Sequence, residues 1–149
     1  MKAVLSSILT FVIALILVGC PGSGDRLVGD ETTKVISSGD NVCFLIPEPM
    51  DYQPIDMGIN SRGTASKNKI FVTEPNLSVV NGELCVPPSF YKFPKNGKLI
   101  SEFILLSRSS HDNTRKFVVG VGIDNGSIFN IPLLSREITR PAGTIDVNE

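Results

Sequence analysis

The sequence predicts an all-β domain, on the basis of three observations. Roughly eight short runs of β-branched and apolar residues recur after position 32, separated by Gly, Pro and Asn. Asn81-Gly82 and Asn125-Gly126 each lie between two such runs, and Asn-Gly in this setting is the strongest short signal for a β-hairpin with a type I′ turn. The stretch LISEFILL at 99–106 is largely apolar on both faces at a period of two, which is typical of a central strand. Together these favour an immunoglobulin-like β-sandwich, with a small closed β-barrel as the alternative.

The expected strands follow one another as short runs between turn residues. They cover Thr33–Ser37, Asn41–Ile46, Ile55–Asn60, Lys69–Thr73, both arms of Leu77–Val86, Leu99–Leu106 and both arms of the hairpin around Asn125. A helix is the alternative for Leu99–Leu106, but the run is short and follows Pro94 and Gly97.

The strand before Asn125 carries the clearest core signal. Alternate residues of a strand point to opposite faces, so four apolar side chains share one face: Phe117, Val119, Val121 and Ile123. We expect this face in the core. Gly120 and Gly122 lie on the other face, where we expect them to relieve close packing rather than to bind phosphate.

An apolar run, Ile8–Val18, follows Lys2 and stops at Gly19-Cys20. It is too short for a transmembrane helix, which needs about 20 apolar residues. A positive start, an apolar stretch and a small residue at the cleavage site predict a secretory signal peptide over residues 1–19, with a membrane anchor helix as the alternative.

The mature chain then has 14 − 1 = 13 basic and 15 acidic residues. It has no basic block, which argues against a nucleic-acid partner.

Leu17-Val18-Gly19-Cys20 looks like the lipobox of bacterial lipoproteins. This resemblance implies cleavage between Gly19 and Cys20 and lipid attachment at Cys20, where several acyl chains would hold the protein durably. An ordinary signal peptide with a chance cysteine is the alternative. In bacterial lipoproteins, an Asp directly after the lipidated cysteine favours retention in the inner membrane. This position is Pro21 here, so the outer membrane is the expected location. We expect residues 20–32 to form a lipidated flexible tether and residues 33–149 a single β domain.

Two cysteines remain, Cys43 and Cys85. In an oxidising compartment an even pair predicts a disulfide, and two free buried thiols are the alternative. The two cysteines and the single histidine do not make a zinc site, and we expect no metal or cofactor.

The inventory of catalytic residues is small. His111 lies in a polar turn and could act as a general base only if a nucleophile met it in space. The chain has no G-x-S-x-G or H-E-x-x-H motif. We therefore interpret His111 as an exposed loop residue, and we expect neither an enzyme nor a small-molecule substrate.

Aromatic side chains supply the candidate partner-binding residues. Phe90, Tyr91 and Phe93 lie in a loop between prolines, and Tyr52 lies in a similar setting. Aromatics on a stiff loop are typical anchors for a protein partner. The alternative is that Phe90 and Phe93 turn inward and close the end of the sandwich.

Five stretches together resemble a known family. They are GCPGSGDR, NVCFLIPEPMDYQPI, LCVPPSFYKFP, VVGVGIDNGSIFNIPL and REITRPAGTIDV. In order and spacing they resemble the enterobacterial type VI secretion immunity periplasmic lipoproteins. The resemblance implies that Cys20 is lipidated, that Cys43 and Cys85 are the cysteine pair, and that the protein is not an enzyme. It also implies that the protein binds and neutralises an effector toxin delivered into the periplasm. An envelope structural or assembly lipoprotein and a lysozyme-inhibitor-like binding protein are the alternatives.

Overall fold

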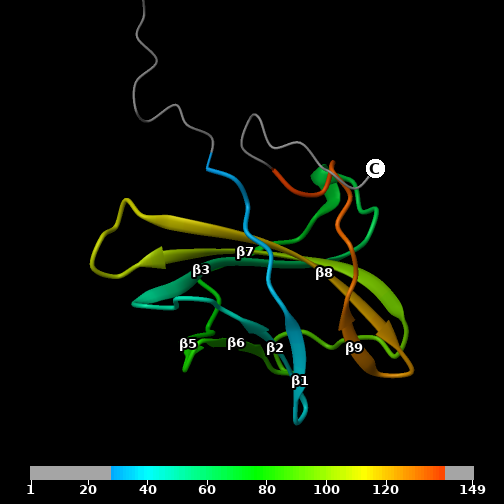
Figure 1. Ribbon diagram of the computed structural model, residues 1–149. Helices are drawn as coiled ribbons and strands as arrows, with labels where there is room; N and C mark the ends of the chain where they lie inside the picture. The colour runs from blue at the N-terminus through cyan, green and yellow to red at the C-terminus, as the bar shows by residue number, and fades with distance from the viewer. Residues whose placement is uncertain (1–27, 140–149) are drawn as a thin grey trace, which may run out of the picture.

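Two antiparallel sheets form the described part of this computed structural model, residues 28–139 (Figure 1). The expected signal peptide, the cleavage site at Gly19 and Cys20, and most of the expected tether lie outside the described residues. Among the residues that are described, no helix is long and apolar enough to cross a membrane.

The strands divide between a four-stranded and a five-stranded sheet. In spatial order, the four-stranded sheet contains β1 (Val35–Ser38), β2 (Asn41–Leu45), β6 (Glu83–Val86) and β5 (Val79–Val80). The five-stranded sheet contains β4 (Val72–Thr73), β3 (Tyr52–Ser61), β7 (Gly97–Ser107), β8 (Thr114–Asp124) and β9 (Ser127–Asn130). A short 3-10 helix, η1 (Ser66–Asn68), lies in the connection from β3 to β4.

The strand order confirms the immunoglobulin-like prediction. The order β1-β2-β6-β5 matches strands A-B-E-D of that fold, and β4-β3-β7-β8 matches C′-C-F-G. Strand β9 extends the second sheet beyond its G position. The chain therefore forms two facing sheets rather than one closed barrel.

Both Asn-Gly hairpins form as predicted. Asn81 and Gly82 have φ values of 50° and 78°, and Asn125 and Gly126 have φ values of 48° and 82°. Positive φ at both central positions is what a type I′ turn requires. These turns set the registers of β5 with β6 and of β8 with β9.

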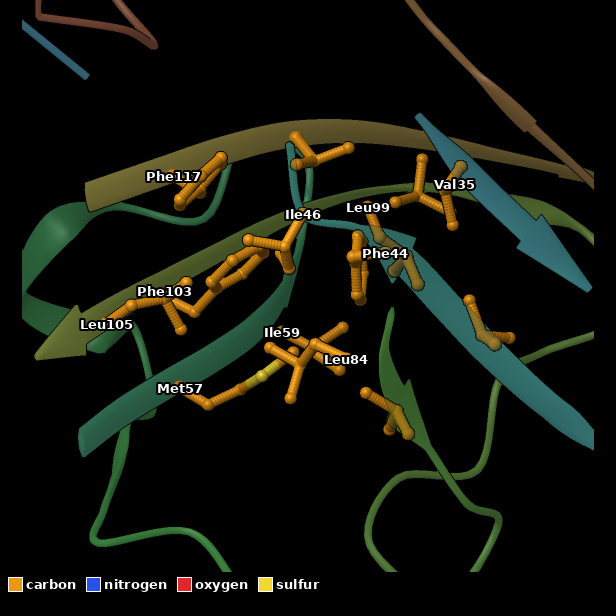
Figure 2. Close-up of a cluster of buried hydrophobic side chains, with 14 of the residues drawn as sticks. Val35, Phe44, Ile46, Met57, Ile59, Leu84, Leu99, Phe103, Leu105 and Phe117 are labelled. Atoms are coloured by element: carbon orange, nitrogen blue, oxygen red, sulfur yellow. The ribbon is translucent and has the colours of Figure 1, made fainter. Parts of the chain in front are cut away.

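The core lies between the sheets (Figure 2). Phe117, Val119, Val121 and Ile123 all belong to it, as the alternation in β8 predicts. Phe103 of β7 stacks on Phe117 with 5.0 Å between ring centroids, and it also contacts Phe44 of β2 across the sandwich at 5.3 Å. Strand β7 lies between β3 and β8, which confirms that Leu99–Leu106 is a strand with a central place.

Several strand bounds differ from the predicted ones, and two of these differences have a clear structural cause. Strand β3 begins at Tyr52 rather than Ile55, and it accommodates Pro54 at a register shift, where a residue without an N–H is tolerated. Strand β4 contains only Val72–Thr73 of the predicted Lys69–Thr73. The backbone N–H and C=O of Ile70 form hydrogen bonds with the side-chain amide of Asn60 instead of with a neighbouring strand.

The outer face of the five-stranded sheet is covered by chain without regular structure. Val118 of β8 is fully buried although it points away from the core. A Cβ added at Gly120 would lie 2.4 Å from the carbonyl oxygen of Ile131. One at Gly122 would lie 2.7 Å from the Ile131 side chain and 2.4 Å from the ring of Phe129, its partner on β9. The prediction that these glycines relieve close packing is therefore confirmed.

The last residues of the predicted tether also belong to the folded domain. The N–H of Glu31 donates to the carbonyl of Lys116 at 2.7 Å, and the N–H of Val118 donates to the carbonyl of Glu31 at 2.8 Å. Glu31 thus adds a parallel bridge to the edge of β8 that β9 leaves open. In the structure the domain begins near Asp30, before the predicted boundary at residue 33.

Candidate binding surfaces

The aromatic loop lies against the core. Phe90, Tyr91 and Phe93 are half-buried and pack on the core cluster. Tyr91 meets Phe93 edge to face with 4.8 Å between centroids, and burial raises the pKa of the Tyr91 hydroxyl. This is the inward arrangement that the sequence left as the alternative, and it leaves only part of each ring for a partner.

Tyr52 is part of the core, with 6% of its surface exposed, and it offers little area to a partner. The Arg115 guanidinium lies 5.4 Å from its ring centroid and 5.0 Å from that of Phe117. Arg115 also forms a bidentate ion pair with Glu31, at 2.7 and 2.5 Å, which raises the pKa of Arg115. The same guanidinium donates to the carbonyls of Pro47 and Glu48. Tyr52 therefore lies under a structural cluster centred on Arg115.

A disulfide joins Cys43 and Cys85, which are direct partners in the register of β2 and β6. Antibody domains link their two sheets through strands B and F, whereas this bond lies within one sheet. Glu83 lies beside the pair, with a carboxylate oxygen 3.7 Å from the Cys85 sulfur. The three side chains lie close enough together to ligate a metal, but the disulfide leaves no thiolate to do so.

His111 lies in an exposed turn. Nearby, Asp51 accepts hydrogen bonds from the Ser107 hydroxyl at 2.9 Å and from the N–H of Ser109 at 2.7 Å. Hydrogen bonding by Ser109 and Ser107 lowers the pKa of Asp51. Within residues 28–139, no hydrogen bond connects His111 to this cluster. Asp51 and the serines therefore act to hold the turn.

A shallow, mostly apolar groove of about 910 Å³ runs along the β1/β9 edge of the sandwich. We call it the edge groove. Its lining is Thr32, Thr33, Lys34, Leu45, Ile46, Pro47, Asn130, Ile131, Pro132, Leu133 and Ile138. The Asn130 side chain bridges the sheets there, accepting from the N–H of Val35 at 3.0 Å and donating to the carbonyl of Thr33 at 2.9 Å. The Thr33 hydroxyl donates to the carbonyl of Leu45.

A second, more polar cleft of about 930 Å³ opens on the outer face of the five-stranded sheet. We call it the terminal cleft, because both ends of the described chain line it. Three ion pairs lie in it: Arg62–Glu137 at 2.6 Å, Lys69–Glu102 at 2.6 Å and Lys116–Asp30 at 3.3 Å. The hydrogen bonds between Arg62 and Glu137 raise the pKa of Arg62 and lower the pKa of Glu137.

The sequence did not reveal either of these surfaces, because each combines segments far apart in the chain. The edge groove joins residues near 33, 46 and 132, and the terminal cleft joins residues near 30, 62 and 137. The only local signal was the apolar run Ile131–Leu134 after the last strand.

Fold and surfaces together define a disulfide-bonded immunoglobulin-like domain with an apolar groove at one edge. Residues 30–126 match the model of a family described as a domain of unknown function, DUF7480, and the chain belongs to that family. No curated protein and no solved structure matches the chain.

Proposed function

We propose that this protein is a lipid-anchored bacterial lipoprotein facing the periplasm, held at the outer membrane through Cys20. In this proposal it is an immunity protein, which binds a type VI secretion effector toxin stoichiometrically and occludes it. The lipobox, the paired cysteines and the resemblance to immunity lipoproteins support this proposal.

The edge groove is the observation that carries the binding role. It offers apolar surface in a concave site, and interface anchors bind best in such desolvated pockets. Its walls are held by hydrogen bonds from Asn130 and Thr33, so little conformational entropy is lost when a partner binds. We therefore assign the effector's apolar anchor residues to this groove.

A protection assay in competing cells tests the role. Deleting the gene should sensitise cells to a periplasmic effector of their sister cells, and the purified effector and lipoprotein should form a complex of fixed stoichiometry. Leu133→Arg places a charge in the groove and should weaken the complex at least about tenfold. Val80→Arg is the matched control, because Val80 is exposed on β5, outside the groove.

Three outcomes would contradict the proposal. If deletion changes sensitivity to no periplasmic effector, the immunity role is wrong. If Leu133→Arg and Val80→Arg weaken the complex equally, the groove is not the contact. Inhibition of lysozyme by the purified chain at micromolar concentration would favour the lysozyme-inhibitor alternative.

A further inference from the structure

Three segments meet on the outer side of the five-stranded sheet. They are residues 28–31, the stretch from Arg62 to Phe71 that contains η1, and residues 134–139, and all three contribute to the terminal cleft or flank it. In Figure 1 the blue start of the described chain, η1 and the red segment before the C-terminus lie on the same side, above β3, β7 and β8. We call this surface the terminal face.

The terminal face carries an excess of unpaired positive charge. Each acidic side chain in the cleft is paired: Asp30, Glu102 and Glu137 bind Lys116, Lys69 and Arg62. Lys98 and Arg136 also line the cleft, and Lys67 lies in η1 beside it. Across residues 28–139, no ion pair includes any of these last three cations. The terminal face therefore presents three exposed cations, whereas every acidic side chain that lines the cleft is already in an ion pair.

Exposed apolar side chains lie on the same face. The described residues contain eight large hydrophobic side chains that are strongly exposed, and four of them belong to the three segments: Val28, Ile70, Phe71 and Leu134. Val28 and Ile70 expose 81% and 73% of their surface. Phe71 lies on the outer face of β3, where its ring contacts Gly58. Apolar and basic side chains on one surface are the combination that binds the interface of an anionic bilayer.

The chain that leads from Cys20 enters the folded domain beside the terminal face. Cys20 precedes Val28 by eight residues, which can span at most about 28 Å when fully extended. A lipid on Cys20 would therefore keep the domain within reach of the headgroups. The residues that follow the anchor enter the fold at Asp30, which itself lines the terminal cleft. The terminal face is thus the surface next to the attachment point.

We infer that the terminal face docks on the anionic bilayer surface, with Lys67, Lys98 and Arg136 at the headgroups and Ile70 and Leu134 at the interface. This inference rests on the proposed lipid anchor. It places the four-stranded sheet on the side away from the membrane and makes the domain orientation fixed rather than free. A partner would then approach the edge groove from the periplasm.

Vesicle partitioning of the unlipidated mature chain tests the inference. The probe is residues 20–149 with Cys20→Ser, mixed with phosphatidylcholine vesicles or with vesicles containing about 30% phosphatidylglycerol. A cation near an anionic surface contributes about fivefold to binding, so three cations allow up to about a hundredfold preference. We expect at least a tenfold preference for the anionic vesicles at low salt, and its loss at 0.5 M salt because the charges are then screened.

Charge-reversal variants locate the contact. Lys98→Glu with Arg136→Glu should reduce anionic binding to the level of phosphatidylcholine. Lys92→Glu with Lys95→Glu is the matched control: both lysines are exposed, lie outside the terminal face, and change the net charge equally. Ile70→Ser should weaken binding less than the charge reversal. All these side chains are exposed, so circular dichroism should show an unchanged fold.

The outcomes separate this inference from the proposed function. No preference for anionic vesicles, or equal loss in both charge variants, overturns membrane docking even where Cys20 is acylated and the protein protects cells. Anionic binding by a chain whose Cys20 is not acylated in cells supports the terminal face as a lipid surface and overturns the anchor.

Discussion

The two sheets of the sandwich are secured in different ways. A covalent bond joins β2 and β6 in the middle of the four-stranded sheet. The five-stranded sheet is instead covered by irregular chain, which ion pairs and close packing hold on its outer face. A disulfide acts mainly by restricting the unfolded chain, whereas ion pairs act in the folded state and respond to pH and salt. Loss of the disulfide should therefore lower the free energy of unfolding with little dependence on pH or salt, whereas loss of the ion pairs should change how that free energy depends on them.

Removing the disulfide should have the largest effect. The cysteines are 42 residues apart, and the loss of this cross-link should cost about 4 kcal/mol of the free energy of unfolding. Cys43→Ala with Cys85→Ala, measured by urea denaturation at neutral pH, should show this loss with little dependence on salt. The reduced wild-type chain is the control and should be destabilised to a similar extent. A loss below about 1 kcal/mol would show that the four-stranded sheet does not depend on its covalent bond.

Breaking the packing of the five-stranded sheet should have the next largest effect. Gly120→Val introduces a Cβ that would meet the Ile131 backbone at 2.4 Å, so β8 or the segment after β9 must move. We expect a cost of about 2–3 kcal/mol, measured by thermal and urea denaturation.

Thr114→Val is the matched control for this packing test. It places the same side chain at an exposed position on the same strand, where the change should stay within about 0.5 kcal/mol. Equal effects of the two substitutions would mean that the outer face of β8 is not closely covered.

Removing the Arg115 side chain should have an intermediate effect. Arg115→Ala removes a bidentate ion pair to Glu31, two hydrogen bonds to loop carbonyls and contacts with two aromatic rings. We expect a loss of about 2 kcal/mol in urea denaturation. Lys116→Ala is the neighbouring control, because Lys116 is half-exposed and its ion pair with Asp30 should contribute less than about 1 kcal/mol. If the two variants lose equal stability, the Arg115 cluster is no stronger than a surface ion pair.

The difference between the sheets also explains what the sequence could predict. Alternation along β8 and the Asn-Gly turns are local signals, and they were sufficient for the strands, the core face of β8 and the immunoglobulin-like class. Arg115 gave no such signal, because Glu31 lies 84 residues away in the chain and Pro47 lies 68. The setting of Tyr52 in the sequence makes it only a candidate for partner binding, because the sequence does not show that its ring is buried beneath the Arg115 guanidinium. Both clefts likewise exist only after distant segments meet.

The smallest effect on stability should come from the Arg62–Glu137 ion pair, which contributes to the dependence of stability on acid pH. Hydrogen bonding to Arg62 lowers the pKa of Glu137, so the folded state gains stability that is fully present above the unfolded pKa, about 4.5, and is lost as pH falls through the lowered folded pKa. Asp51 has a lowered pKa for a separate reason and acts with the same sign. Urea denaturation should therefore give a constant free energy of unfolding from pH 7 to about 5 and a decrease below that.

Arg62→Ala should remove part of this acid sensitivity. The variant should lose about 1 kcal/mol or less at pH 7, because the pair is partly exposed, and its loss of stability below pH 4.5 should be shallower than that of the wild type. Asp51→Asn with Arg62→Ala should flatten the profile further, because the Asp51 carboxyl is then absent and Glu137 has lost the side chain that lowers its pKa most. Hydrogen exchange gives an independent readout: the N–H of Leu134, which donates to Glu137, should exchange faster in Arg62→Ala while core amides of β7 stay protected. An acid profile identical to that of the wild type would mean that Glu137 does not hold the covering segment on the sheet.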